Sequence, residues 1–191
     1  MKYILFAAAI AFSSTASLAQ SFGIRPGMPI SELQVLSTTP PGVFEVKPPV
    51  KHPDFEGYFV VATPETGVCK VTAMSKMIGN DASGIVAQRK FADIASQLTS
   101  RYGDSILLDH LVSNSTLTKP EDFTAGIFKS ERTYVRAWRR EVNSNLPQET
   151  KAILLLINAA EPGVTSISLF YDFTNLDRCE ALLSAADASK L

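Results

Sequence analysis

Apolar residues alternate with polar ones, or run together, in six short β-rich segments of the chain. Such segments are typical of strands. Pro64 and Gly67 bracket the gap between the second and third segments, as in a tight hairpin turn. The predicted strands cover residues 43–46, 58–63, 68–77, 132–140, 150–158 and 166–173.

A helical period appears most clearly between residues 83 and 102, where apolar residues return every three or four positions. Asp81 or Ser83 can cap the first turn of this helix, and Gly103 stands where a C-terminal cap belongs. Shorter helices are predicted at 31–36, 120–129 and 176–186. Residues 104–119 form a polar loop in this interpretation, with a short apolar patch at 106–112.

The order of these elements predicts an α+β fold. We expect antiparallel meanders of about six strands, with the helices packed on one face. A helix followed by three strands occurs in both residues 20–103 and residues 104–191, which suggests a pseudo-duplication. Residues 20–191 together have the usual length of a single domain.

The first nineteen residues have the three-part layout of a secretory signal peptide. Lys2 supplies a positive start, residues 3–12 are apolar, and residues 13–19 are small. Ser17 and Ala19 occupy the −3 and −1 positions of a cut before Gln20. The apolar run is about half the ~20 residues that span a bilayer. We therefore predict export to the periplasm or the medium, with a retained signal anchor as the alternative.

The rest of the composition predicts a soluble protein without a strong overall field. The chain has 18 basic and 19 acidic residues, a formal net charge of −1. Such a balance does not favour nucleic acid or anionic membranes as partners. No later apolar run approaches membrane-spanning length, so we expect no transmembrane segment after signal removal.

Cys69 and Cys179 are the two cysteines of the chain. In an oxidising compartment such a pair is usually a structural disulfide. The alternative, a reactive thiol, lacks a CxxC spacing or a base nearby in the sequence.

Residues with catalytic or ligand chemistry are scattered. His52 and His110 lie in separate predicted loops and form no HExxH or HxH motif, so we predict no metal site. Neither a GxSxG elbow nor an SxxK motif occurs. The segment 79–84 lacks the Gly-Lys-Ser/Thr end of a phosphate loop. We predict no catalytic residues and no cofactor. The acid pairs Glu121/Asp122 and Asp172/Asp177 do not by themselves indicate a glycosidase.

One strand carries an unusual set of large polar and aromatic residues. Tyr134, Arg136, Trp138 and Arg140 alternate onto one side of the segment 132–140. Arginine and tryptophan are enriched at interface hot spots, so this side is a candidate protein- or glycan-binding surface. The alternative is that Trp138 belongs to the core and the arginines cover its rim.

Residues 22–33, FGIRPGMPISEL, resemble the G-x-x-x-G-M-x-x-x-E-L opening of small envelope proteins built from a helix and three strands. These include outer-membrane-assembly lipoproteins of the SmpA/OmlA type and the β-lactamase-inhibitor-like fold. The chain lacks their acylated cysteine, which argues against a lipid anchor. The resemblance implies binding or scaffolding in the envelope.

The leading functional hypothesis is a non-catalytic envelope protein. In this hypothesis it binds another protein or an envelope polymer through its sheet or through the proline-rich segment 38–53. A small secreted hydrolase is the first alternative, with His110 placed beside a carboxylate and a hydroxyl. The second is an inhibitor module that acts on another protein. Oligomeric state is left open by the sequence.

Overall fold

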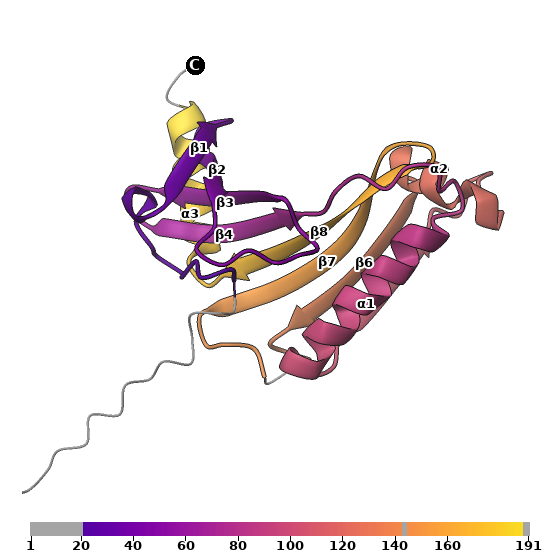
Figure 1. Ribbon diagram of the computed structural model, residues 1–191. Coiled ribbons are helices and arrows are strands. Elements are labelled where there is room, and N and C mark those ends of the chain that lie inside the picture. The colour runs from indigo at the N-terminus through magenta and orange to yellow at the C-terminus, as the bar shows by residue number, and fades with distance from the viewer. Residues whose placement is uncertain (1–20, 143–144, 189–191) are drawn as a thin grey trace, which may run out of the picture.

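A computed structural model describes residues 21–142 and 145–188, which form one twisted antiparallel sheet with helices on both sides (Figure 1). The predicted signal peptide, residues 1–19, lies outside the described residues. The sheet has eight strands in the order β1-β2-β3-β4-β8-β7-β6-β5. They are β1 Gln34–Thr38, β2 Val43–Lys47, β3 Gly57–Thr63, β4 Gly67–Met74, β5 Ile106–Leu111, β6 Arg132–Arg139, β7 Thr150–Glu161 and β8 Val164–Phe173.

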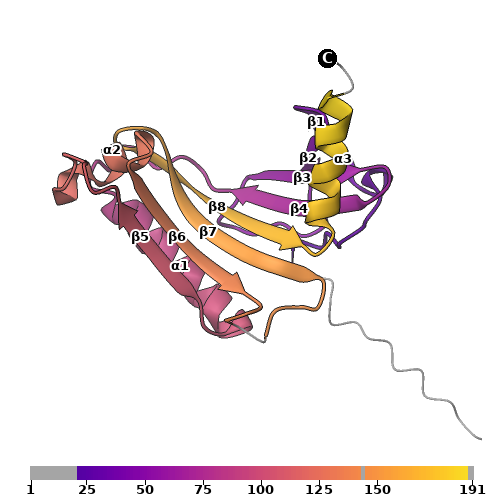
Figure 2. The same ribbon diagram turned by 180° about the vertical axis from the view of Figure 1, so that it is seen from behind.

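Three α-helices and two 3-10 turns complete the fold: α1 Ile85–Tyr102, α2 Phe123–Phe128, α3 Leu176–Ala188, η1 Ile30–Glu32 and η2 Pro120–Asp122. Helix α1 crosses the β6–β8 side of one sheet face, whereas α3 stands over β3 and β4 on the opposite face (Figures 1 and 2). The predicted α+β class with antiparallel strands is confirmed. The expectation that the helices share one face is wrong, because the chain leaves β8 toward the face that α1 does not cover.

The two halves of the chain meet at the centre of the sheet. Residues 34–74 supply the meander β1–β4, residues 106–173 supply β5–β8, and β4 pairs with β8. Directly opposed residues at this joint include Val71 with Tyr171 and Thr72 with Phe170. Each half thus contributes four strands rather than three. The pseudo-duplication stays a prediction, since the two long helices lie on opposite faces.

The two strands that the sequence did not predict are both edge strands. β1 lies where a helix was predicted at 31–36, and only η1 is helical there. β5 lies in the predicted polar loop, at its apolar patch. An edge strand pairs on one side only and both of its faces can reach water, so the alternating pattern that marks an inner strand is weak.

The main core lies between the sheet and α1. Apolar residues of α1 pack against β7 and β8, and the first turn is capped by Asp81, whose carboxylate accepts the Ala87 N–H at 2.9 Å. Gly103 ends the helix at a φ of 80°, as predicted. The segment 21–33 and the Pro-rich loop 48–56 pack beside α1 on the same face of the sheet, over the strands of the N-terminal half of the chain. The buried α1 residues are Ala87, Phe91, Ile94, Ala95, Leu98 and Tyr102.

A bulge in β4 decides where Cys69 points. Val61 opposes Lys70 but Ala62 opposes Val68, so Cys69 is the extra residue between them. Simple alternation would place Cys69 on the same face as Val71. The shift instead puts Cys69 on the α3 side, in a small cluster separate from the main core.

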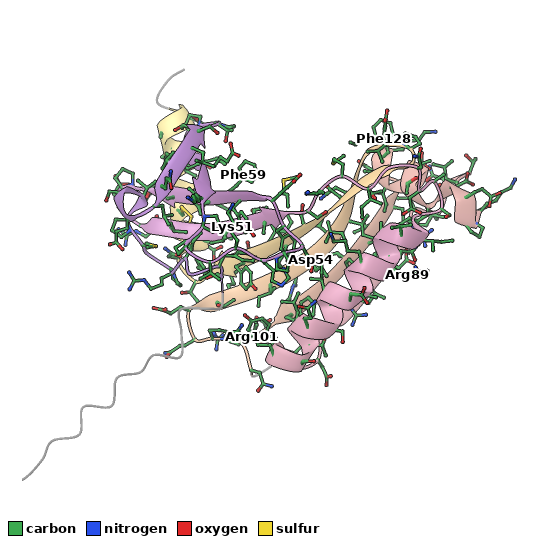
Figure 3. The ribbon with its side chains drawn as sticks, viewed as in Figure 1. Lys51, Asp54, Phe59, Arg89, Arg101 and Phe128 are labelled. Atoms are coloured by element: carbon green, nitrogen blue, oxygen red, sulfur yellow. A yellow bond between two sulfur atoms is a disulfide. The ribbon has the colours of Figure 1, made fainter. Side chains whose placement is uncertain are left out.

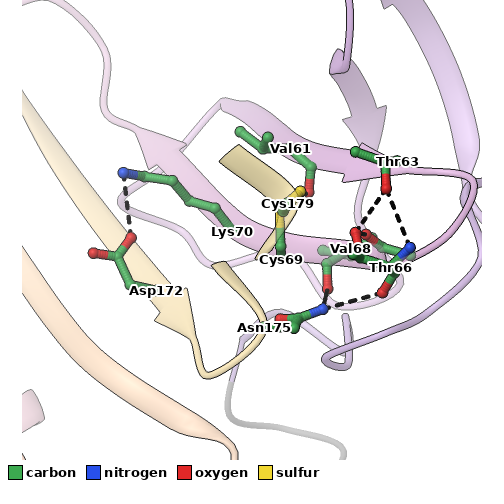
Figure 4. Close-up of a disulfide and its surroundings, with 10 residues drawn as sticks. Val61, Thr63, Thr66, Val68, Cys69, Lys70, Asp172, Asn175 and Cys179 are labelled. Carbon is green, nitrogen blue, oxygen red and sulfur yellow. Dashed lines mark hydrogen bonds and ion pairs between the residues drawn. A yellow bond between two sulfur atoms is a disulfide. The ribbon is translucent and has the colours of Figure 1, made fainter. Parts of the chain in front are cut away.

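Cys69 and Cys179 form a disulfide between β4 and α3 (Figure 4). Both residues are fully buried, and the bridge closes a loop of 110 residues. Next to it, the Asn175 side-chain amide donates to the carbonyl oxygens of Thr66 and Val68, at 3.1 Å each. These contacts hold the start of α3 on the hairpin of β3 and β4.

No helix within residues 21–142 and 145–188 has both the length and the apolar character to cross a membrane.

Replacing both cysteines, in Cys69→Ala/Cys179→Ala, should lower the free energy of unfolding by about 2–5 kcal/mol, because the unfolded chain gains freedom. Urea unfolding followed by circular dichroism measures the change. Dithiothreitol should lower the wild-type midpoint similarly and leave the double variant unaffected. Alkylation of both thiols in unreduced, denatured protein would contradict the disulfide.

Candidate functional site

Trp138, the centre of the predicted binding surface, lies in the core. Its side chain is 0% exposed, and its indole N–H donates to the Gly103 carbonyl at 3.1 Å. Trp138 opposes Ile153 on β7, which in turn opposes Tyr171 on β8, and this row faces α1. Trp138 therefore offers no contact surface itself and belongs to the core, which is the alternative that the sequence left open. The alternation was correct, but α1 covers that face.

The other three members of the predicted surface have structural contacts. The Tyr134 ring meets those of Phe91 and Phe123 edge-on, at centroid distances of 5.0 and 5.4 Å. Arg136 donates to the Ser105 hydroxyl at 3.2 Å. Arg140 donates to the carbonyl oxygens of Pro147 and Gln148, at 2.7 Å each. These contacts join β6 and the residue that follows it to α1, to α2 and to the segments around Ser105 and Pro147.

Three of the four acids in the pairs Glu121/Asp122 and Asp172/Asp177 are engaged in local contacts. Asp172 pairs with Lys70 at 3.2 Å, and Asp177 pairs with Lys151. Asp122 accepts the Lys119 N–H, which closes the turn at η2.

The two histidines lie on different elements. His110 is exposed on the edge strand β5, opposite Thr133, and His52 lies in the Pro-rich loop next to Asp54. In the described part of the chain, no group of three or more His, Cys, Asp or Glu side chains could hold a metal ion.

The sheet face opposite α1 has an apolar centre across β5–β8, which is bordered by the polar residues Ser168, Asp172 and Arg139. Figure 2 shows it with α3 over the N-terminal strands, whereas α1 lies against β7 and β8 on the other side. Two neighbouring rows of opposed residues cross it in register. We call this surface the open face; its residues are Ile106, Ala137, Leu154 and Phe170 in one row and Leu108, Val135 and Leu156 in the next.

The strand β5 is the free end of the open face. Ile106, Leu107 and Leu108 are 50%, 42% and 50% exposed, although they follow one another in a strand. Ile106 and Leu108 continue the open face, whereas Leu107 points to the α1 side. The strand is fixed to β6 by a two-pronged ion pair in which Arg132 donates to Asp109 at 2.8 and 2.7 Å. The ion pair therefore helps to hold β5 in place, with the backbone N–H and C=O groups of its outer edge directed away from the sheet.

The other edge strand, β1, has a different character. Val35 and Leu36 are exposed there too, but β1 is bulged between Val35 and Ser37. β1 also carries polar residues, since Ser37 opposes Glu45 on β2 and donates to its carboxylate at 2.8 Å. Bulges and charges are the usual means of blocking an edge. β5 has no bulge in its pairing with β6.

The sequence signal for this site was the apolar patch at 106–112. The sequence did not show that this patch is a strand at the edge of the sheet.

In comparisons with known proteins, no protein family, curated protein or solved structure matches the chain significantly.

Because Trp138 is the one tryptophan of the chain, its fluorescence reports its surroundings directly. We expect emission shifted to the blue and weak quenching by acrylamide. Trp138→Ala should lower the free energy of unfolding by about 3–5 kcal/mol, as for other buried aromatic residues.

The neighbouring exposed residue supplies the control: Arg139→Ala should change stability by less than about 0.5 kcal/mol. Red-shifted, readily quenched emission from native protein would contradict the burial of Trp138.

Proposed function

We propose that this protein is exported and acts, without catalysis, by binding another protein through the edge strand β5 and the adjoining open face. The observation that carries the proposal is the run of three exposed apolar residues, 106–108, on an unblocked edge strand. The partner segment is an extended peptide with apolar residues at alternate positions.

Strand addition accounts for both features of the site. The outer N–H and C=O groups of an edge strand bind a further strand, and the side chains on each face supply specificity. An added strand places alternate residues beside Ile106 and Leu108, so that its apolar side chains extend the rows of the open face. Exposed apolar patches of this kind mark interaction sites in soluble domains.

Separate observations support the proposed compartment. The Cys69–Cys179 disulfide fits an oxidising environment such as the periplasm or the medium. Residues 1–19 have the layout of a signal peptide. The resemblance of residues 22–33 to small envelope proteins stays a prediction, and it also implies binding or scaffolding in the envelope.

Site-specific photocrosslinking in the native host tests the proposal. A benzophenone amino acid at position 107 should yield one defined adduct with another protein, and the same residue at position 36 on β1 should not. The double variant Ile106→Lys/Leu108→Lys should lose most of the adduct, since two ammonium groups would be desolvated at the contact. Its fold should be intact, because both positions are half exposed.

The adduct's composition decides the outcome. An adduct with a different protein, whose addition slows amide exchange across residues 106–111, supports strand addition. An adduct of twice the protein's own mass would replace the foreign partner with a second copy. No adduct, or equal adducts from both edges, would refute the proposal.

A further inference from the structure

A second site lies on the other side of the sheet, between α1 and the Pro-rich loop. The cavity there has a volume of about 150 Å³ and opens to solvent. Its walls come from the C-terminal half of α1 and from the loop 48–56, and its floor comes from β8 and the N-terminal segment. None of these residues belongs to the open face or to β5.

The inner surface of the cavity is apolar. Its floor and lower walls are formed by buried side chains: Phe22, Phe55, Ile94, Leu98, Leu169 and Tyr171. An apolar cavity of about this volume accommodates a benzene ring. Burial raises the pKa of Tyr171 well above its ordinary value, with the hydroxyl of Tyr102 adding to the effect. Its phenol therefore stays neutral, and the interior carries no charge.

The mouth of the cavity is cationic. Lys51 on the loop and Arg101 near the end of α1 both line it, and Figure 3 shows them on the same side of the sheet. Neither forms an ion pair with a carboxylate of the described residues. The nearby carboxylate of Asp54 is already engaged, 3.6 Å from the Lys90 ammonium and 3.7 Å from His52. The Arg101 guanidinium lies 5.6 Å from the centre of the Tyr102 ring, and its charge, like that of Lys51, is not neutralised by a carboxylate in the described part of the chain. The two cations therefore attract an anion to the mouth.

The loop wall is held in place before any ligand binds. The Val50 N–H donates to the Phe22 carbonyl at 2.9 Å, and the His52 N–H donates to the Tyr58 hydroxyl oxygen at 2.9 Å. The Tyr58 hydroxyl in turn lies 3.3 Å from the Phe55 carbonyl oxygen. Three prolines, at positions 48, 49 and 53, restrict the backbone between these anchors. A preformed cavity loses little conformational freedom on binding.

We infer that this cavity binds a small amphipathic anion, with an apolar body of about one ring in the pocket and its acidic group at the rim that carries Lys51 and Arg101. The inference is independent of the proposed protein partner, because the two sites use different faces of the sheet.

Calorimetry with 3-phenylpropanoate and two analogues tests the ligand class. The carboxylate should bind in the micromolar to millimolar range. The uncharged 3-phenylpropanamide should bind at least about tenfold more weakly, and acetate, which lacks the apolar body, should not bind measurably. Raising the salt from about 20 mM to about 300 mM should weaken binding of the carboxylate, since the rim charges are exposed.

Two variants locate the contact. Arg101→Gln and Lys51→Gln should each weaken binding of the carboxylate by about three- to tenfold. Arg89→Gln, an exposed arginine on the same helix and away from the cavity (Figure 3), should leave it unchanged. Amide shifts in NMR spectra should fall on residues 50–55 and 94–101.

Equal affinity for acid and amide, unchanged binding by both rim variants, or shifts confined to β5–β8 would overturn the inference, as would a carboxylate that does not bind at all. Ile106→Lys/Leu108→Lys, which tests the protein-binding edge, should leave 3-phenylpropanoate binding intact.

Discussion

The pairing of β4 with β8 holds this molecule together. It joins two four-stranded meanders, made from the two halves of the chain, into a single sheet. The hydrogen-bonded joint is accompanied by the ion pair between Lys70 and Asp172, and Lys70 also lies 5.0 Å from the centre of the Phe170 ring. Each meander is covered by a helix from the other half of the chain. α1 follows β4 in the sequence but covers β7 and β8, and α3 follows β8 but covers β3 and β4. Neither half would therefore have a long helix packed on its own strands without this joint.

This exchange of helices between the halves also explains why the two candidate sites are separate. α1 and the Pro-rich loop cover one face and leave a small cavity where they meet. α3 covers only one end of the opposite face, so the apolar rows of β5–β8 remain half-buried, and they are most exposed at Ile106 and Leu108. A sheet in a compact domain normally buries at least one face completely and keeps the other polar. Here the centre of the second face is apolar, which is the reason to expect a partner there.

Local patterns predicted the inner parts of the fold well. The long helix ends at Gly103 as expected, the six inner strands were all found, and the cysteines are paired. The two edge strands were missed because pairing on one side leaves little mark in the sequence. Alternation showed which residues share a side with Trp138 but not which side α1 covers, since that depends on contacts between distant segments. A period of two also cannot reveal a one-residue bulge, so alternation alone would place the Cys69 side chain on the wrong face.

The central position of β8 has a consequence for how the chain is made. β8 spans Val164–Phe173 and is the last of the described strands to be synthesised, yet both meanders depend on it. The opposed residues Lys70 and Asp172 are about a hundred positions apart, and such long-range pairings form slowly. A nascent chain therefore cannot close its sheet until β8 has left the ribosome. Under the proposed export, this late closure would keep the precursor unfolded while it crosses the membrane.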